Sequence, residues 1–196
     1  KRLIAYSSIS HMGFVLIGIY SFNTLALQGV IVQMLAHGIS AAGLFIMSGQ
    51  LYERLHTRDL NQMGGLYARM RTLPPIAMFF AAASVGLPGL GNFVGEFLIL
   101  LGAFKVNPVV TMFAASGLVF GAVYALIMVQ RSIHGAPKSD APIRDLSWRE
   151  LSMMLSLMAL LLGLGLYPQP VLDTSAAVMH GVSQAAKSAL PLTLAP

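Results

Sequence analysis

Residues 76–104 read IAMFFAAASVGLPGLGNFVGEFLILLGAF. This stretch is apolar almost throughout, as a segment that crosses the hydrocarbon core of a membrane must be. A straight helix of this length would be about 43 Å long, at 1.5 Å per residue, whereas the core is about 30 Å thick. Residues 86–92 hold a proline and several glycines, which end or bend helices. The stretch therefore predicts two half-helices joined by a break in the middle of the membrane.

Four further segments are apolar over the roughly 20 residues that a bilayer crossing takes. They are residues 3–22, 27–50, 109–130 and 146–167. With the broken segment they predict an all-α, polytopic transmembrane bundle of about five helices, in which residues 1–170 form a single transmembrane domain. The remaining tail, 171–196, is rich in Ala and Ser and weakly amphipathic, which is compatible with a short interfacial helix.

The composition agrees with a membrane protein. Of the 196 residues, 56% are hydrophobic and only 10% are charged, against about 25% charged in soluble domains, and the mean hydropathy is +0.74. The absence of cysteine excludes disulfides, iron–sulfur ligation and thiolate zinc sites in this chain. The net charge of +5 comes from basic residues scattered between apolar segments rather than from a run, so nucleic acid is not an expected partner.

The positions of the basic residues predict the topology, because cytoplasmic loops carry an excess of Lys and Arg. With five crossings, most of the twelve Lys and Arg residues fall on one side. These are Lys1, Arg2, Arg54, Arg58, Arg69, Arg71, Arg131, Lys138, Arg144 and Arg149. Only Lys105 and Lys187 fall on the other side. The N-terminal end is therefore predicted to be cytoplasmic and the tail to lie on the opposite face. Since the sequence opens at Lys1 and enters an apolar span almost at once, we interpret it as the C-terminal part of a longer protein.

Glu96 is the only acidic residue predicted to lie deep inside a span, since Glu150 falls at the start of the segment 146–167. An ionised carboxylate in hydrocarbon is costly unless it is paired or hydrated, so such residues are candidates for function. The break beside Glu96 also suggests function, because transporters use helices broken at mid-membrane, whose free ends can hold ions or water. The alternative is a buried, hydrogen-bonded structural acid. We interpret Glu96 as functional.

Two histidines are predicted near the middle of spans. His37 shares a helix face with Gln33 and Ser40, and His11 follows Ser7 by one turn. Imidazole titrates near neutral pH and can pass protons in both directions, so both residues are candidates for a proton relay with Glu96. The alternative is a pair of neutral histidines that hydrogen-bond neighbouring helices. The other histidines fall outside the spans and are expected to be ordinary surface residues: His56, His134 and His180.

No motif for a bound cofactor is present. Residues 89–95 do not form G-x-G-x-x-G and follow no predicted strand. One carboxylate and two well-separated histidines do not give the spacing of a metal site. We therefore predict neither cofactor-binding nor metal-binding residues in this chain.

Five stretches carry a resemblance: KRLIAYSSISHMG at 1–13, HGISAAG at 37–43, GQLYER at 49–54, the segment from Asp59 through GGL at 64–66, and GLPGLGNFVGEF at 86–97. They resemble the antiporter-like subunits of respiratory complex I over essentially the whole chain. The Phe-Val-Gly-Glu form around Glu96 and the YPQP at 167–170 are typical of the branch called subunit M, or chain 4, of bacterial NADH:quinone oxidoreductase.

The resemblance implies a fold of two inverted helical repeats, each with one broken helix, of which this chain would be the C-terminal portion. It implies a multi-pass protein of the bacterial inner membrane, with a periplasmic tail, that moves protons while other subunits pass electrons from NADH to quinone. His11 and His37 would be relay members, and Glu96 would be the terminal residue that hands the proton outward. No redox centre is expected in this chain.

The resemblance also implies partners. These are the other complex I membrane subunits, especially neighbouring antiporter-like subunits, together with the lipid bilayer and the upstream helices of the chain's own full-length protein. FMN, iron–sulfur clusters and quinone would belong to partner subunits. Alternatives are a subunit of a multi-subunit Na⁺/H⁺ antiporter or of a membrane-bound hydrogenase, and a structural scaffold whose polar residues carry no protons.

Overall fold

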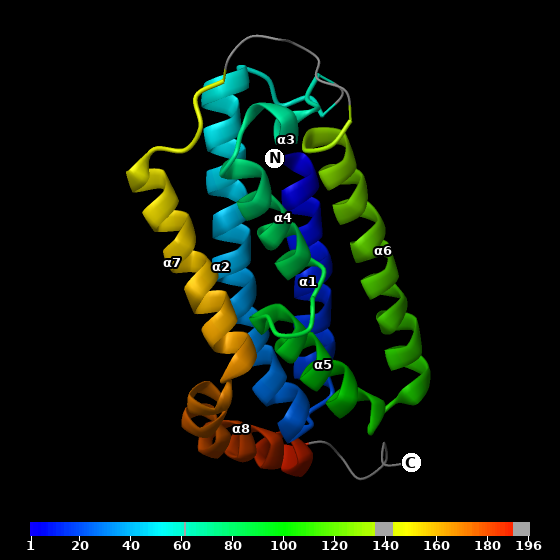
Figure 1. Cartoon of the computed structure of the whole chain (residues 1–196). Coiled ribbons are helices and arrows are strands. Elements are labelled where there is room, and N and C mark those ends of the chain that lie inside the picture. The colour runs from blue at the N-terminus through cyan, green and yellow to red at the C-terminus, as the bar shows by residue number, and fades with distance from the viewer. Residues whose placement is uncertain (61, 136–142, 190–196) are drawn as a thin grey trace.

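The computed structural model describes residues 1–60, 62–135 and 143–189, and every regular element in these ranges is an α-helix (Figure 1). The helices are α1 (Arg2–Tyr20), α2 (Thr24–Leu55), α3 (Leu66–Arg69), α4 (Leu73–Ser84), α5 (Gly91–Phe104), α6 (Pro108–Ser132), α7 (Trp148–Leu166) and α8 (Gln169–Ala189). The predicted all-α class is confirmed. Lys138, used for the predicted topology, and residues 190–196 of the predicted tail lie outside the described ranges.

Four of these helices, α1, α2, α6 and α7, are long and apolar enough to cross a membrane alone. The apolar helices α4 and α5 are shorter and follow one another along the bundle, so that together they make the remaining crossing (Figure 1). They are separated between Ser84 and Gly91, close to the predicted break at 86–92. The polytopic bundle with a divided third crossing is therefore confirmed.

The break is built around a left-handed glycine at the end of α4. Gly86 has φ +77°, and its N–H donates to the carbonyl oxygen of Ala83 at 3.1 Å. The N–H of Leu87 donates to the carbonyl oxygen of Ala82, also at 3.1 Å. This pair of bonds is the Schellman motif, in which glycine is favoured because a Cβ strains the left-handed conformation. Asn92 of α5 adds a further bond, since its Nδ2 donates to the Ala83 carbonyl at 2.9 Å.

The helix α2 lies at the centre of the bundle, where it packs against α1, α4, α5, α7 and α8. Its approach to α5 is especially close. A Cβ built on Gly95 would lie 2.6 Å from the Cα of Gln33, and one built on Gly102 would lie 2.5 Å from the backbone nitrogen of Ala26. Only glycine allows two helix backbones to come this near. These contacts fix the position of α5 along the axis of α2.

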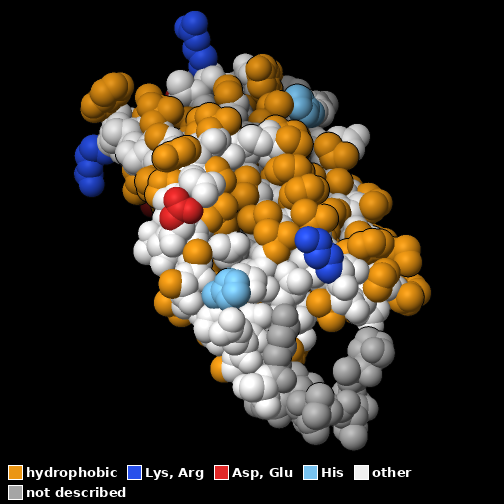
Figure 2. Space-filling model, turned by 90° about the horizontal axis from the view of Figure 1, so that it is seen from below, with side chains coloured by type: hydrophobic (Ala, Val, Ile, Leu, Met, Phe, Trp, Pro, Cys, Tyr) orange, Lys and Arg blue, Asp and Glu red, His pale blue; other side chains and the backbone are white. Residues whose placement is uncertain are grey.

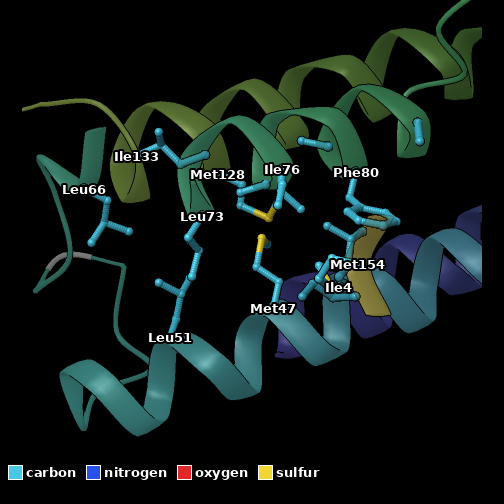
Figure 3. Close-up of a cluster of buried hydrophobic side chains, with 14 of the residues drawn as sticks. Ile4, Met47, Leu51, Leu66, Leu73, Ile76, Phe80, Met128, Ile133 and Met154 are labelled. Atoms are coloured by element: carbon cyan, nitrogen blue, oxygen red, sulfur yellow. The ribbon is translucent and has the colours of Figure 1, made fainter. Parts of the chain in front are cut away.

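A buried apolar cluster fills the bundle between the break and the end where α1 begins (Figure 3). It includes Met47 and Leu51 of α2, Phe80 of α4 and Met128 of α6, so α4 is held between α2 and α6. Phe80 is completely buried. The cluster lines this half of the bundle interior with apolar side chains.

The helix α4 begins at Leu73, earlier than predicted, because a distant aspartate supplies its N-terminal acceptors. Asp145 Oδ2 accepts the backbone N–H groups of Arg71 and Thr72, each at 2.8 Å. Burial acts to raise the pKa of Asp145, but hydrogen bonds from the Thr72 hydroxyl and from the backbone of Thr72, Leu146 and Arg71 outweigh it and hold the pKa at about 2. Unpaired N–H groups at a helix start need such acceptors.

The helix α7 begins at Trp148, slightly later than predicted, because Ser147 and Glu150 form a capping box in front of it. Glu150 Oε2 also forms an ion pair with Arg54 Nη2 of α2 at 2.8 Å. Arg54 Nε donates to the carbonyl oxygen of Arg144 at 2.7 Å. The segment before α7 is thereby tied to the C-terminal end of α2.

At the opposite end, α8 lies across the bundle (Figure 1). Ser183 Oγ donates to the carbonyl oxygen of Phe22, in the turn between α1 and α2, at 2.6 Å. Part of the predicted tail is thus a long helix docked on the bundle.

Seen from this end in Figure 2, hydrophobic side chains cover much of the surface, and charged ones are scattered. Phe113 and Phe120 of α6, for example, are 77% and 70% exposed, as suits side chains that face lipid or another apolar helix.

Candidate functional site

The centre of the site is the Glu96 carboxyl group, which is 3% exposed inside the bundle. Glu96 lies in the early part of α5, just after the break. The preceding Gly95 presses α5 against Gln33 of α2, and this close contact holds the carboxyl group beside α2 and α1. The structure thus places Glu96 inside the apolar bundle, as the sequence predicted.

His11 of α1 is the first partner of Glu96. Its Nδ1 lies 2.8 Å from Glu96 Oε1, although the two residues are 85 positions apart in sequence. Both side chains are buried. With Glu96 ionised, the Nδ1–H group of His11 donates to the carboxylate, and a second proton on the ring would make the contact an ion pair. Such a contact is short enough for direct proton transfer between the two groups.

Gln33 of α2 is the second partner. Its Nε2 donates to the same carboxylate oxygen, Glu96 Oε1, at 3.2 Å. Gln33 is completely buried. One oxygen of Glu96 therefore takes two hydrogen-bond donors from two different helices.

His37 extends the chain of titratable groups by one step. Its ring centroid lies 4.8 Å from that of His11, with the two planes tilted by 40°. The contacts run in the order His37, His11, Glu96, so His11 is the middle member. The structure thus brings all three predicted site residues together.

A second pair of polar side chains lies farther along the contact between α2 and α5. Asn92 Nδ2 donates to Ser40 Oγ at 3.0 Å, and Ser40 Oγ donates to the carbonyl oxygen of His37 at 3.2 Å. The antiparallel helices therefore pair Gln33 with Glu96 and Ser40 with Asn92. Sequence reasoning singled out Gln33 and Ser40 as neighbours of His37 but missed Asn92, whose only signal was a polar residue inside the glycine-rich break.

Several buried polar atoms around this centre have no hydrogen-bond partner within the described part of the chain. They are His11 Nε2, His37 Nδ1, Gln33 Oε1, Asn92 Oδ1 and the hydroxyl of Tyr124. Buried polar atoms are nearly always satisfied, commonly by internal water. Tyr124, on α6, was not recognised from the sequence because a tyrosine in an apolar span is an ordinary packing residue. These atoms make the centre a polar site enclosed by apolar helices.

The remaining histidines lie elsewhere. His56, His134 and His180 are exposed, as the sequence predicted, and His134 stacks on Tyr67 with ring centroids 5.9 Å apart. Among residues 1–60, 62–135 and 143–189, no group of three or more His, Cys, Asp or Glu side chains is arranged to hold a metal ion. A cavity of about 620 Å³ opens near the start of α1, where Lys1, Arg2 and Arg58 line it. It does not include His11, His37 or Glu96.

Comparison with known proteins gives a consistent result. The family model described as "NADH:quinone oxidoreductase/Mrp antiporter, TM" matches residues 1–121. The chain is 67% identical to NADH-quinone oxidoreductase subunit M of Pseudomonas aeruginosa, over 94% of this chain and 36% of that protein. It is 56% identical to subunit M of Escherichia coli strain K12, over 94% of this chain and 37% of that protein. The chain thus spans little more than a third of the length of these curated relatives.

Two solved structures share the fold. A chain of respiratory complex I from Thermus thermophilus with bound NADH superposes with a TM-score of 0.88 at 31% identity, covering 92% of this chain and 38% of that one. A chain of the Mrp complex from Dietzia sp. gives a TM-score of 0.83 at 19% identity, covering 94% of this chain and 43% of that one. The second match is a likeness of fold alone. The resemblance to subunit M predicted from the sequence is confirmed.

Proposed function

This chain belongs to the NADH:quinone oxidoreductase/Mrp antiporter family of membrane subunits, and from that premise we propose that it carries protons across the membrane as part of an NADH:quinone oxidoreductase. The protein is proposed to contribute no redox centre. Electron transfer from NADH to quinone would take place in other subunits, and this chain would use the free energy released there.

The observation that carries the proposal is the unbroken contact from His37 through His11 to Glu96. The His37 and His11 rings are 4.8 Å apart, and His11 Nδ1 is 2.8 Å from Glu96 Oε1. Three titratable groups in contact inside an apolar bundle are costly to maintain, and such groups usually mark an ion pathway. A purely structural role would be served as well by amides, which do not exchange protons.

In the proposed relay, His37 and His11 pass a proton toward Glu96, and Glu96 hands it outward. Imidazole can accept a proton on one nitrogen and release one from the other, which suits the middle position that His11 occupies. Moving one charge against a potential of 100 mV takes about 2.3 kcal/mol. A change in the hydrogen bonds around Glu96 is enough to supply an energy of that order, since one bond to a charged group contributes about 1.5–3 kcal/mol.

The proposed location is the bacterial inner membrane, with the α1 N-terminus on the cytoplasmic side and α8 on the periplasmic side. The excess of Lys and Arg at the first of these ends supports this orientation. Residues 1–170 would then be the transmembrane domain, with the following residues on the periplasmic face. The exposed apolar faces of α6 and α7 would meet lipid and neighbouring antiporter-like subunits, and further helices of the full-length chain would pack on the rest.

A sodium–proton antiporter subunit is the main competing function, because the Mrp complex from Dietzia sp. shares the fold. The much higher identity to subunit M, at 67%, favours the oxidoreductase. A membrane-bound hydrogenase subunit would use the same helices and is distinguished by its partners. A scaffold function would predict that changes at Glu96, His37 and His11 alter stability alone.

The test is Glu96→Gln in the full-length chain within its assembled membrane complex. Glutamine keeps the shape and can accept the bonds from His11 and Gln33, but it cannot exchange a proton. We expect normal assembly with loss of both proton pumping and NADH:quinone turnover. The control is Glu53→Gln, which alters an exposed acid. Normal pumping by the Glu96→Gln complex would overturn the proposal and favour a scaffold.

A further inference from the structure

The two oxygens of the Glu96 carboxyl group face different surroundings. Oε1 accepts hydrogen bonds from His11 Nδ1 at 2.8 Å and from Gln33 Nε2 at 3.2 Å. Oε2 points to the break, where a Cβ built on Gly86 would lie only 2.7 Å from it. One edge of the carboxyl group is thus held by two donors, and the other edge lies against a residue with no side chain.

The space beside Oε2 exists because of how α4 ends. Gly86 occupies the left-handed position of the Schellman motif, with φ +77°, and its missing side chain leaves room for the carboxyl oxygen. Gly89, in the same break, also has a left-handed backbone, with φ +95°, but a Cβ there would meet nothing within 4 Å. Both glycines suit the turn, whereas only Gly86 leaves space that Glu96 uses.

The terminal torsion of Glu joins an sp³ to an sp² carbon, so it is soft and nearly two-fold, and a half-turn exchanges the two oxygens. We propose that the Glu96 carboxyl group carries the proton by this half-turn, receiving it on the oxygen that faces His11 and releasing it from the side that faces Gly86. This inference rests on the proposed function and adds a motion to it.

The proton balance of each step is simple. When protonated His11 gives up its proton, the Nδ1–H bond breaks and an O–H bond forms at Oε1, leaving a neutral imidazole and a neutral carboxylic acid. The half-turn moves the O–H group to the Gly86 side. There the O–H bond breaks, the proton passes to water, and a carboxylate remains. Because the two oxygens of a carboxylate are equivalent, no reverse turn is needed before the next proton arrives.

Gln33 acts as a positioning residue in this scheme. After the half-turn, and once His11 again carries a proton on Nδ1, the carbonyl oxygen of the acid occupies the place of Oε1, where His11 Nδ1 and Gln33 Nε2 both donate to it. A carbonyl oxygen is a better acceptor than the oxygen of an O–H group, so these bonds favour the state in which the proton faces Gly86. The close contact of Gln33 with Gly95 holds the Gln33 amide beside the Glu96 carboxyl group.

The first experiment compares Gly86→Ala with Gly89→Ala in the assembled, full-length complex. Both changes strain a left-handed backbone in the same way, but only the first places a methyl group against the carboxyl group. We expect Gly86→Ala to lower pumping per assembled complex about tenfold or more, which corresponds to a barrier raised by at least about 1.4 kcal/mol. Gly89→Ala should retain pumping. Equal pumping by the two variants, with Glu96→Gln inactive, would overturn the half-turn and leave the proposed function standing.

A second measurement does not depend on the folding of the Gly86 variant. Infrared difference spectra of the complex, taken across a pH titration, should contain a carbonyl stretch from protonated Glu96 that Glu96→Gln removes. If the carbonyl oxygen faces Gln33, Gln33→Leu removes a hydrogen bond from it and raises the stretching frequency. An unchanged frequency in Gln33→Leu would mean that the proton stays on the His11 side, and the half-turn would be wrong. Normal pumping by Glu96→Gln would instead overturn the proposed function itself.

Discussion

His11 Nδ1 and Glu96 Oε1 are 2.8 Å apart and join α1 to the second half of the divided crossing. The contact is buried, so removing one partner leaves the other without its main hydrogen bond. Truncating one member of a buried charged pair typically costs about 3–5 kcal/mol, whereas replacing both can be nearly neutral. The pair therefore predicts that substitutions of His11 and Glu96 have coupled effects on the free energy of unfolding.

His11→Leu is expected to destabilise the protein strongly in a Glu96 background and much less in a Glu96→Gln background. The difference between the two effects, about 1–3 kcal/mol for groups in contact, is the coupling energy. It can be measured by thermal unfolding of the purified full-length chain in detergent. His180→Leu, at an exposed position, is the control and should show no coupling to Glu96. Additive effects of His11→Leu and Glu96→Gln would argue against the contact.

Two glycines of α7 give a matched pair of tests for the packing of the break. A Cβ on Gly165 would run into the carbonyl group of Gly89, while a Cβ on Gly163 would meet nothing within 4 Å. We expect Gly165→Ala to destabilise the bundle by about 1–3 kcal/mol, as overpacking does. Gly163→Ala should be neutral or slightly stabilising, because alanine favours a helix. Thermal unfolding checks both, and equal effects would mean that α7 does not press on the break.

Asp145 offers a prediction about pH. Its folded pKa of about 2 lies below the value of 3.8 that it has without the fold. The stabilisation from this lowered pKa is therefore fully present above about pH 5 and is lost as the pH falls from about 4 to about 2. Asp145→Ala should cost about 0.5–2 kcal/mol near neutral pH, as loss of a helix cap does, and progressively less below pH 4. The measurement is the difference in unfolding between the two proteins across the pH range, with Asp173→Ala as the exposed control. A difference that stays constant down to pH 3 would contradict the assignment.

Asn92 is expected to stabilise the break between α4 and α5. Asn92→Leu removes the bonds to the Ala83 carbonyl and to Ser40 Oγ and leaves both acceptors buried without that donor. A cost of about 1–3 kcal/mol for each unsatisfied group is expected. Unfolding measurements on Asn92→Leu check this, with Gln130→Leu as the control at an exposed amide of α6. A loss no larger than that of the control would mean that the break holds without Asn92.

Hydropathy and the rules for proline and glycine were enough to predict the crossings and the break. A crossing must be apolar over its whole length, and residues 76–104 cannot remain one straight helix within a membrane. The same reasoning identified Glu96, because a single acid in an apolar span is conspicuous. His11 and His37 were recognised as candidates for the same reason. Their direct contact with each other and with Glu96 could not be read from the sequence, since it depends on how three helices pack.

The parts that escaped prediction depend on contacts between distant segments. The early start of α4 requires Asp145, which lies far along the chain in a segment without regular structure. Asn92 was overlooked because its partners, Ala83 and Ser40, come together only after α4 and α5 pack on α2. The weakly amphipathic tail predicted at most a short interfacial helix, and the length of α8 depends on its docking against the α1–α2 turn.

The uninterrupted course of α2 has a mechanical consequence. Arg54 near the C-terminal end of α2 pairs with Glu150 of α7, and Gln33 in its first third donates to Glu96, so one continuous helix joins a surface ion pair to the buried carboxyl group. The two attachment points are about 32 Å apart along the helix axis, at 1.5 Å per residue. An α-helix resists compression along its axis, so a displacement of the Arg54 end along the axis would also displace Gln33. The neighbouring crossing is divided at Gly86 into α4 and α5, so the Glu96 carboxyl group lies where a continuous helix packs beside a divided one.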